Sequence, residues 1–167
     1  MGTKAMDFDR LKWLLYISVF PVCFTLVGGY LLIRGMLDYQ LGYAANNWPA
    51  TTGTITASSV AEDDHGDETT YLALVLYTYS VDAKDFRNDE IYAGYGGSSN
   101  KATALAMANK YAVGNSVSVL YNPDSPANAV LESGIGISTY IMILFSLPIV
   151  FIGGALLRLL PAEWRQK

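Results

Sequence analysis

Residues 13–33 read WLLYISVFPVCFTLVGGYLLI, and residues 135–157 read IGISTYIMILFSLPIVFIGGALL. Neither stretch contains a charged residue. Each is long enough to cross a bilayer as a helix, for which about 20 apolar residues suffice. We therefore predict transmembrane helices at 13–33 and 135–160. The first helix should run on past Arg34 and break at 46–49, because the residue before a proline leaves helical conformation.

The residues between the two apolar stretches are polar, and they alternate like the strands of a small water-exposed domain. We expect a juxtamembrane extension over 34–47, a β domain over 48–134, and short end segments at 1–12 and 161–167. The predicted fold class is membrane α + β. Two transmembrane helices flank a small extracytoplasmic antiparallel β domain that contains one short helix.

Small residues inside the apolar stretches suggest how the two helices pack. Gly28-Gly29 lies in the first stretch and Gly153-Gly154-Ala155 in the second. Such patches let helices approach closely. We expect them to serve the helix hairpin or a partner subunit.

Basic residues lie on the outer side of both apolar stretches. These residues are Lys4, Arg10, Lys12, Arg158, Arg165 and Lys167. Residues 34–134, in contrast, hold 12 acidic and five basic residues, a net charge of −7. Basic flanks stay on the cytoplasmic side of a membrane. We therefore predict that both termini are cytoplasmic and that the middle domain is periplasmic or extracellular.

Charge and cysteine content restrict the remaining classes of protein. An acidic middle domain repels phosphate backbones, so nucleic acid is not an expected partner. The single cysteine, Cys23, lies inside the first apolar stretch. The middle domain must therefore hold together by packing and not by a disulfide. The first stretch is longer than the apolar core of a signal peptide, and we interpret it as a retained anchor.

The first half of the middle domain predicts strands. Residues 52–60 are rich in threonine, isoleucine, serine and valine, which favour strands. Residues 71–81 alternate most clearly, and both faces of their first half are apolar. We expect this half to be central and buried on both faces. The chain should turn over 82–85 and return antiparallel over 86–92.

The second half of the middle domain predicts one helix and two strands. A helix is expected over about 100–112, with Ser98 or Ser99 as its N-cap and Gly114 as its C-cap. Strands are expected over 116–121 and 127–132, separated by the turn that Asn-Pro-Asp-Ser-Pro predicts.

Three motifs follow one another along the middle domain. They are Trp48-Pro49 with Thr52-Gly53-Thr54-Ile55, Tyr77-Thr78-Tyr79 with Val81, and Tyr111 and Gly114 followed by Val117 to Pro123, Pro126, Ala129 and Leu131-Glu132. In this order they resemble a bacterial family of membrane proteins known as domain of unknown function 3592, over roughly residues 48–134. One departure is Ala112-Val113, where the family pattern has a proline before the glycine. The resemblance implies membrane spans around a small β domain, and it implies no reaction.

The acidic run EDDHGDE at residues 62–68 is the sharpest local cluster. Carboxylates are the ligands of hard cations such as Ca²⁺. The candidate ligands are Asp63, Asp64, Asp67 and Glu68. The spacing does not match an EF-hand loop, and His65 by itself cannot build a zinc site. The alternative interpretation is a solvated hairpin tip that keeps the sheet edge from pairing.

Tyrosine is abundant in the middle domain and is enriched at protein interfaces, because its ring is apolar and its hydroxyl is polar. The candidate partner-binding residues are Tyr77, Tyr79, Tyr92 and Tyr95. Packing of these rings in the core or against the membrane is the alternative, and the sequence leaves both open.

The sequence offers no nucleophile with a base in reach, because its one histidine lies in the acidic loop. We therefore expect no enzyme and no cofactor. The leading hypothesis is a non-enzymatic accessory subunit of the inner membrane, surrounded by lipid, whose β domain binds other membrane protein subunits. The alternative is a membrane-anchored sensor or binding module for a cation or small ligand at 62–68, and a hydrolase is a third hypothesis.

Overall fold

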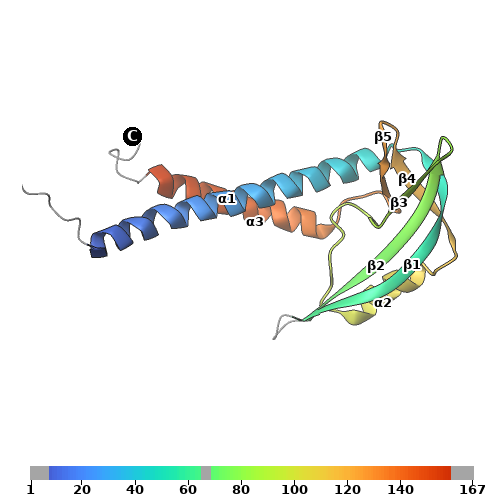
Figure 1. Ribbon diagram of the computed structural model, residues 1–167, viewed down its shortest axis with the longest axis horizontal. Helices are drawn as coiled ribbons and strands as arrows, with labels where there is room; N and C mark the ends of the chain where they lie inside the picture. Colours follow the sequence, from blue (N-terminus) through green and yellow to red (C-terminus); the bar gives the residue numbers. More distant parts are fainter. Residues whose placement is uncertain (1–7, 65–68, 159–167) are drawn as a thin grey trace, which may run out of the picture. The chain divides into compact units, whose positions relative to one another are not determined.

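The computed structural model describes residues 8–64 and 69–158, with side chains from residue 19 onward. The elements, in chain order, are α1 (Phe8–Ala45), β1 (Ala50–Asp64), β2 (Thr69–Val81), β3 (Lys84–Asn88), α2 (Lys101–Lys110), β4 (Ser116–Asn122), β5 (Ser125–Val130) and α3 (Ile137–Arg158) (Figure 1). They form two compact units. A helical unit contains α1 up to Met36 and α3 from Tyr140, and a β unit contains Leu37–Thr139.

The helical unit pairs α1 with α3 through close contacts at glycines. A Cβ added to Gly28 would lie 2.8 Å from Ile149 Cγ2, and one added to Gly153 would lie 2.9 Å from the backbone nitrogen of Thr25. Gly29 and Gly154 have no neighbour within 4 Å of such an atom. The predicted close approach is therefore confirmed for one glycine of each pair. Both helices are long and apolar enough to cross a membrane.

The C-terminal turns of α1 belong to the β unit. The helix ends at Ala45, which confirms the predicted break at 46–49. A Cβ at Gly42 would collide with the carbonyl oxygen of Gly134 and would lie 3.1 Å from the Cβ of Ala93. These close contacts pack the last turns of α1 against the segments that precede α2 and α3.

A five-stranded antiparallel sheet forms the rest of the β unit, with strand order β3-β2-β1-β4-β5. The sheet curls, so that its two edge strands come together. The side-chain amide of Asn88, at the end of β3, donates to the β5 carbonyls of Ala127 and Ala129 at 3.0 and 3.1 Å. The prediction of a small antiparallel β domain with one short helix is therefore confirmed.

The core fills the concave side of this curled sheet. Its largest fully buried members are Ile55, Val75, Tyr77, Ile91, Val119 and Val130. The helix α2 packs on the same side through Ala104 and Ala108. Alanine has a small side chain, which lets the helix backbone come close enough for Ser58 Oγ to donate to the carbonyl of Ala108 at 2.8 Å.

The hairpin between β2 and β3 is tighter than predicted. Only Asp82 and Ala83 form the turn, with φ of 50° and 61°, as a two-residue hairpin of the primed type requires. The strand β3 therefore begins at Lys84 and ends at Asn88, and not over 86–92. Asn88 Oδ1 accepts from the next two backbone nitrogens and so ends the strand.

The caps of α2 also differ from the prediction. Its N-cap is Asn100, whose side chain accepts from the backbone of Ala102 at 2.9 Å. The backbone of Ser98 is instead paired with Tyr71. The helix ends at Lys110 with Tyr111 as its C-cap, and Gly114 lies in the following turn with φ +86°, where its N–H donates to the carbonyl of Ile55.

Part of the hairpin formed by β1 and β2 extends beyond the curled body of the sheet (Figure 1). The strand β4 pairs with β1 only over Ala50–Thr54, and β3 pairs with β2 only over Tyr77–Val81. The remainder is a two-stranded ribbon, in which Ala57–Asp64 pairs with Thr69–Leu76. The ribbon and the curled body therefore share two strands but differ in the number of neighbouring strands.

Candidate functional site

The two faces of β2 have different surroundings, although both are apolar in sequence. One face, from Ala73 to Val81, is buried. The other face carries Leu72, Leu74 and Leu76, of which Leu74 is 45% exposed and its two neighbours are half-buried. The prediction that the first half of this strand is buried on both faces is therefore wrong, because α2 covers only one side.

This uncovered leucine row continues onto β1. Leu72, Leu74 and Leu76 stand opposite Ala61, Ser59 and Ala57 in the antiparallel register. Opposite residues project to the same side of a sheet. We call this surface the open face of the ribbon: Ala57, Ser59, Ala61, Leu72, Leu74 and Leu76. It is an apolar surface that the part of the chain described by the structure leaves exposed.

Tyr77 and Tyr79 lie in the core, with exposures of 0% and 3%. The hydroxyl of Tyr77 donates a bifurcated hydrogen bond to the carbonyls of Glu90 and Ala129, at 2.9 and 3.0 Å. That of Tyr79 donates to the carbonyl of Pro126 at 2.6 Å. Burial raises the pKa of both tyrosines above the ordinary value. These two rings hold β2 to β5, and the structure places them in the core, the alternative that the sequence leaves open.

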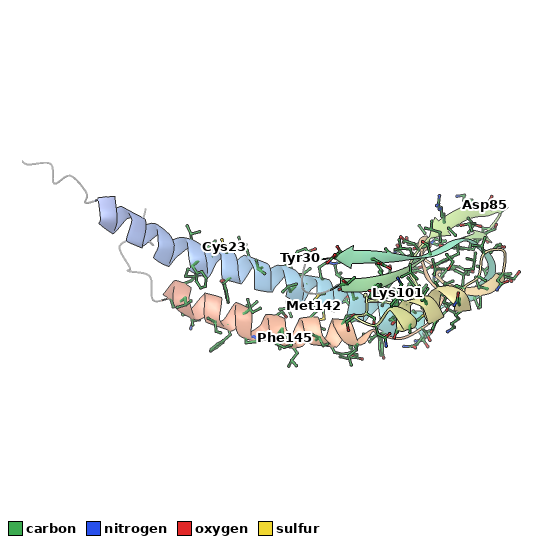
Figure 2. The ribbon with its side chains drawn as sticks, turned by 90° about the horizontal axis from the view of Figure 1, so that it is seen from below. Cys23, Tyr30, Asp85, Lys101, Met142 and Phe145 are labelled. Carbon is green, nitrogen blue, oxygen red and sulfur yellow. The ribbon has the colours of Figure 1, made fainter. Side chains whose placement is uncertain are left out.

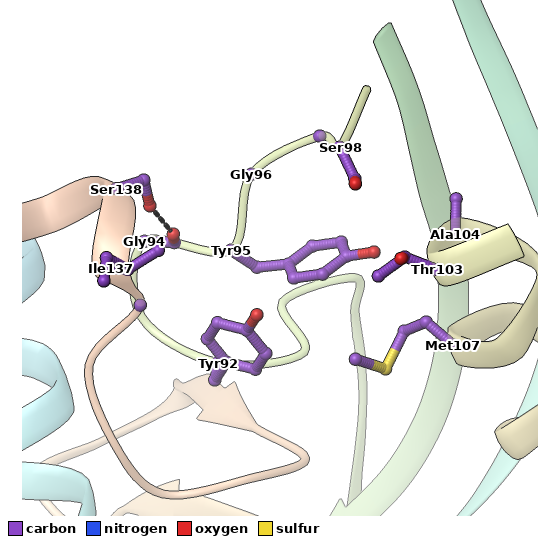
Figure 3. Close-up of a pocket in the computed structure, with 12 residues that line it drawn as sticks. Tyr92, Gly94, Tyr95, Gly96, Ser98, Thr103, Ala104, Met107, Ile137 and Ser138 are labelled. Atoms are coloured by element: carbon purple, nitrogen blue, oxygen red, sulfur yellow. Dashed lines mark hydrogen bonds between the residues drawn. The ribbon is translucent and has the colours of Figure 1, made fainter. Parts of the chain in front are cut away.

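Tyr92 and Tyr95 are half-buried and lie on the segment that crosses from β3 to α2. Their rings meet edge to face, with centroids 5.1 Å apart. They line a cavity of about 270 Å³ with Gly94, Gly96, Gly97, Ser98, Thr103, Ala104, Met107, Gly136, Ile137 and Ser138. Figure 3 shows the two tyrosine rings on one side of this cavity and Thr103 and Met107 of α2 on the other.

We call this cavity the tyrosine cup, and its lining is uncharged. Its lining combines two aromatic rings and a methionine with serine and threonine hydroxyls, and none of its lining residues is charged. Its wall is fixed, because Ser138 Oγ donates to the carbonyl of Gly94 and a Cβ at Gly94 would collide with Thr139 Oγ1. A site of this size suits one uncharged side chain or a small neutral molecule.

The acidic run ends β1 and continues into residues outside the described part of the chain. Glu62 forms an ion pair with Lys101 of α2, whose ammonium also lies 5.4 Å from the ring centroid of Tyr71. Asp63 and Asp64 lie on β1, whereas Asp67 and Glu68 fall outside the described residues. Among residues 8–64 and 69–158, no group of three or more acidic, histidine or cysteine residues could hold a metal ion.

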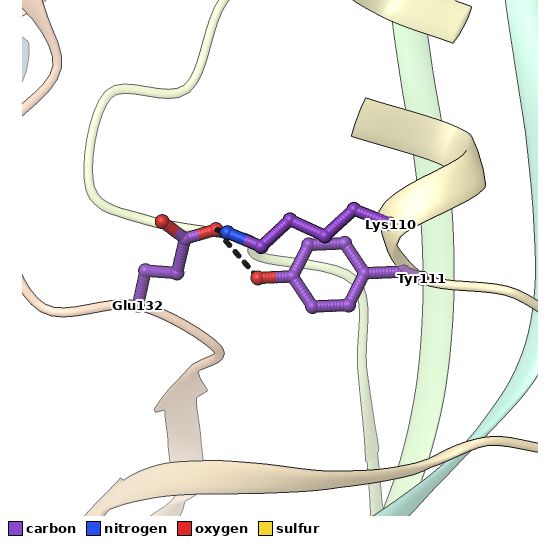
Figure 4. A network of polar contacts seen from close by, with 3 residues as sticks. All are labelled: Lys110, Tyr111 and Glu132. Carbon is purple, nitrogen blue, oxygen red and sulfur yellow. Dashed lines mark hydrogen bonds and ion pairs between the residues drawn. The ribbon is translucent and has the colours of Figure 1, made fainter. Parts of the chain in front are cut away.

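A second ion pair joins the end of α2 to the segment after β5. Lys110 Nζ lies 2.9 Å from Glu132 Oε1, and the hydroxyl of Tyr111 donates to the same oxygen at 2.5 Å (Figure 4). Burial alone would raise the pKa of Glu132, but the hydrogen bonds from Tyr111 and Lys110 outweigh it and lower that pKa. Burial, and then the hydrogen bond to Glu132, raise the pKa of Tyr111. This network is structural, since it fixes α2 against the core.

The fold and these surfaces define a class of protein: a small curled β domain that lies, in the order of the chain, between two long apolar helices. The family described as "Domain of unknown function (DUF3592)" matches residues 51–136. The chain belongs to this family, which confirms the resemblance seen in the sequence. No curated protein and no solved structure matches the chain.

Proposed function

We propose that the chain is a two-pass protein of the bacterial inner membrane. The support comes from α1 and α3, which expose large apolar side chains on their surfaces, among them Leu26, Leu144, Phe145 and Phe151. Figure 2 shows Phe145 projecting outward from α3. Apolar surface left in water costs about 25 cal/mol per Å², so a lipid environment stabilises these helices. The basic residues that flank the two apolar stretches support cytoplasmic termini and a β domain on the outer side.

Single-cysteine variants test this topology. A chain with Cys23→Ser and Asp124→Cys carries its thiol in the exposed turn between β4 and β5. A membrane-impermeant maleimide should label that thiol in intact spheroplasts. A chain with Cys23→Ser and Lys4→Cys should be labelled only after lysis. The opposite pattern would contradict the proposed orientation.

The function proposed for the β domain is non-enzymatic: it binds another membrane protein subunit, as an accessory subunit does. The observation that carries this proposal is the open face of the ribbon. Leu74 is about half exposed in a row of three leucines, on a rigid sheet whose other face is packed by α2. Exposed apolar surface on a folded domain is typical of a binding site for another protein.

The proposal is tested by purifying the tagged full chain from membranes in a gentle detergent and quantifying the proteins that accompany it. With the wild-type chain we expect a stoichiometric set of membrane proteins. With the Leu74→Glu variant, the amount of these proteins should fall at least tenfold. Leu105→Glu is the matched control, because Leu105 is a 43% exposed leucine on α2, away from the open face. The proposal fails if the wild-type chain purifies alone, or if both variants retain the same proteins.

A second candidate function is a binding module for a small ligand, and the tyrosine cup favours it. The cup is neutral, aromatic and preformed. Its wall contains Ile137, the first residue of α3. Thr103→Trp should fill the cup without touching the open face. If this variant impairs the protein in cells while leaving the purified assembly intact, ligand binding is the better assignment.

A further inference from the structure

The hydrogen bonds of β2 fix the direction of the backbone groups in the ribbon. Tyr71 of β2 exchanges two backbone hydrogen bonds of 2.8 Å with Ser98, so its N–H and C=O face away from β1. Glu62 stands directly opposite Tyr71. In an antiparallel pair, directly opposite residues either both bond across the pair or both face outward. The N–H and C=O of Glu62 therefore face away from β2.

The same alternation extends along β1. Ala73 stands opposite Val60, and its N–H faces outward, where it donates to the hydroxyl of Tyr95 at 3.3 Å. Every second residue of a strand points its backbone groups the same way. Ser58, Val60 and Glu62 therefore direct their N–H and C=O groups to the outer side of β1. We call these groups the free edge.

No strand in the described part of the chain pairs with the free edge. The strand β4 leaves β1 at Thr54, and the turn at 114–115 then bonds Ile55. The outer edge of β2 in the ribbon is different, because the segment at 95–98 bonds it. The outer edge of β2 is therefore hydrogen-bonded to a neighbouring segment, whereas the outer edge of β1 is available for pairing.

The free edge is held in place, and two of the common protections of an edge strand are missing from it. The segment SSVAE at 58–62 contains no proline and no lysine, which are residues that block edge pairing. The side chains of Ser58 and Glu62 are bonded to Ala108 and Lys101 of α2. These contacts are made on the face of the ribbon and fix the strand in its extended form. An added strand would therefore meet a preorganised partner.

We propose that the free edge binds an extended segment of the partner subunit as an additional antiparallel strand; this rests on the function proposed above. Strand addition uses backbone hydrogen bonds for affinity and alternate side chains for specificity. On the open face, large apolar side chains of that segment pass over Ala57 and Ala61 toward the leucine row. The sequence at the end of β1 is acidic, which is complementary to a lysine or arginine in the added segment.

Charge distinguishes this occupant from a second copy of the chain. Residues 50–64 contain no basic residue, so a second β1 brings only further acidic residues to the edge. A neutral or basic extended segment from another protein adds the same backbone bonds and balances the charge. The occupant is therefore a different chain, with apolar residues at every second position and a basic residue at one end.

A labelled peptide of alternating valine and threonine, with lysine at both ends, is the probe, and the full chain in detergent micelles is the receptor. Fluorescence anisotropy should show binding that Val60→Pro weakens at least tenfold. Val60→Thr should bind within twofold, because it retains the N–H. A proline fits this position since the Val60 N–H makes no bond to β2. Equal binding by the proline variant, or by a peptide with alternate N-methyl groups, overturns the proposal.

Amide hydrogen exchange in the wild-type chain tests the same geometry without a variant. The amides of Ser58, Val60 and Glu62 should exchange at least tenfold faster than those of Ser59 and Ala61, and the peptide should slow the first three. Absence of slowing overturns the proposal. So does a dimer of the chain that Val60→Pro dissociates, because the second copy would then occupy the edge.

Membrane purification separates the two proposals. If Leu74→Glu loses the accompanying proteins and Val60→Pro keeps them, the accessory function stands and strand addition is wrong. If neither variant loses them, both are wrong.

Discussion

The curled body of the sheet and the ribbon are built from the same two strands, but they are closed to different extents. In the body, the hydroxyls of Tyr77 and Tyr79 reach carbonyls on or near β5, about 50 residues away in sequence. In the ribbon, the helix α2 covers one face only, and the leucines lie on the other face. Closure therefore depends on distant segments that supply polar partners and a second layer, and not on the apolar character of the strand.

The largest difference should appear when an apolar side chain is removed from each region. Tyr77→Ala should lower the free energy of unfolding of the β unit by about 3–5 kcal/mol, because it leaves a cavity and unpaired carbonyls. Leu74→Ala, on the open face, should cost less than about 1 kcal/mol. Chemical denaturation of the full chain in micelles, followed by near-ultraviolet circular dichroism, measures both. Equal costs would mean that the open face is covered in the folded chain.

The tyrosine hydroxyls alone should account for a smaller part of this difference. Tyr77→Phe should cost about 1–2 kcal/mol, since the carbonyls of Glu90 and Ala129 lose a donor while the ring still fills the core. Asn88 still donates to Ala129, which limits the loss. The same denaturation assay measures this variant, and a cost near that of the alanine variant would contradict the assigned roles of ring and hydroxyl.

The buried tyrosines also predict a pH dependence of stability. Burial raises the pKa of Tyr77 and Tyr111 in the folded chain above the ordinary value of 10.0. Their contribution is therefore complete below pH 10 and is lost as the pH rises above it. Tyr77→Phe should lose less stability between pH 10 and pH 12 than the wild-type chain. An identical alkaline slope would show that Tyr77 does not titrate on unfolding.

The sequence predicts the elements well because their signals are local. Proline at position 49 ends α1, and the alternation over 71–81 predicts β2. The misplaced boundaries have physical reasons. Asp82 and Ala83 both adopt positive φ, which alanine does not favour, so the two-residue turn is not evident from the sequence.

The candidate site was less predictable, since the contacts that decide it are distant in sequence. Tyr77 and Tyr92 each follow an aliphatic residue in the sequence, yet one is held by β5 and the other lines a cavity with α2. The leucine row was expected in the core because both faces of its strand are apolar. Which face α2 would cover depends on packing that alternation alone does not contain.

A smaller effect should distinguish the two ion pairs, one in each region. Glu132→Gln should cost below about 1 kcal/mol at neutral pH, because Glu132 accepts from Tyr111 and Lys110. Its pKa is lowered in the folded chain, so this stability is present above about pH 4.5 and is lost as the pH falls through the folded pKa. The variant should flatten that acid slope. Glu62→Gln, in the more exposed pair of the ribbon, should not change stability measurably.

The smallest change in the free energy of unfolding should come from replacing alanine by glycine, and it should have opposite signs in the two regions. Ala83 lies in the body hairpin with φ 61°, a conformation that costs an L-residue about 1–2 kcal/mol and costs glycine little. Ala83→Gly should therefore raise the free energy of unfolding by about 0.5 kcal/mol, after the added entropy of the unfolded chain is subtracted. Ala61→Gly, in the ribbon, relieves no positive φ and should lower it by about 0.5–1 kcal/mol. Paired denaturation curves measure both substitutions. A gain at both positions would mean that the ribbon is strained as well, and the distinction between a closed body and an open, relaxed ribbon would have to be abandoned.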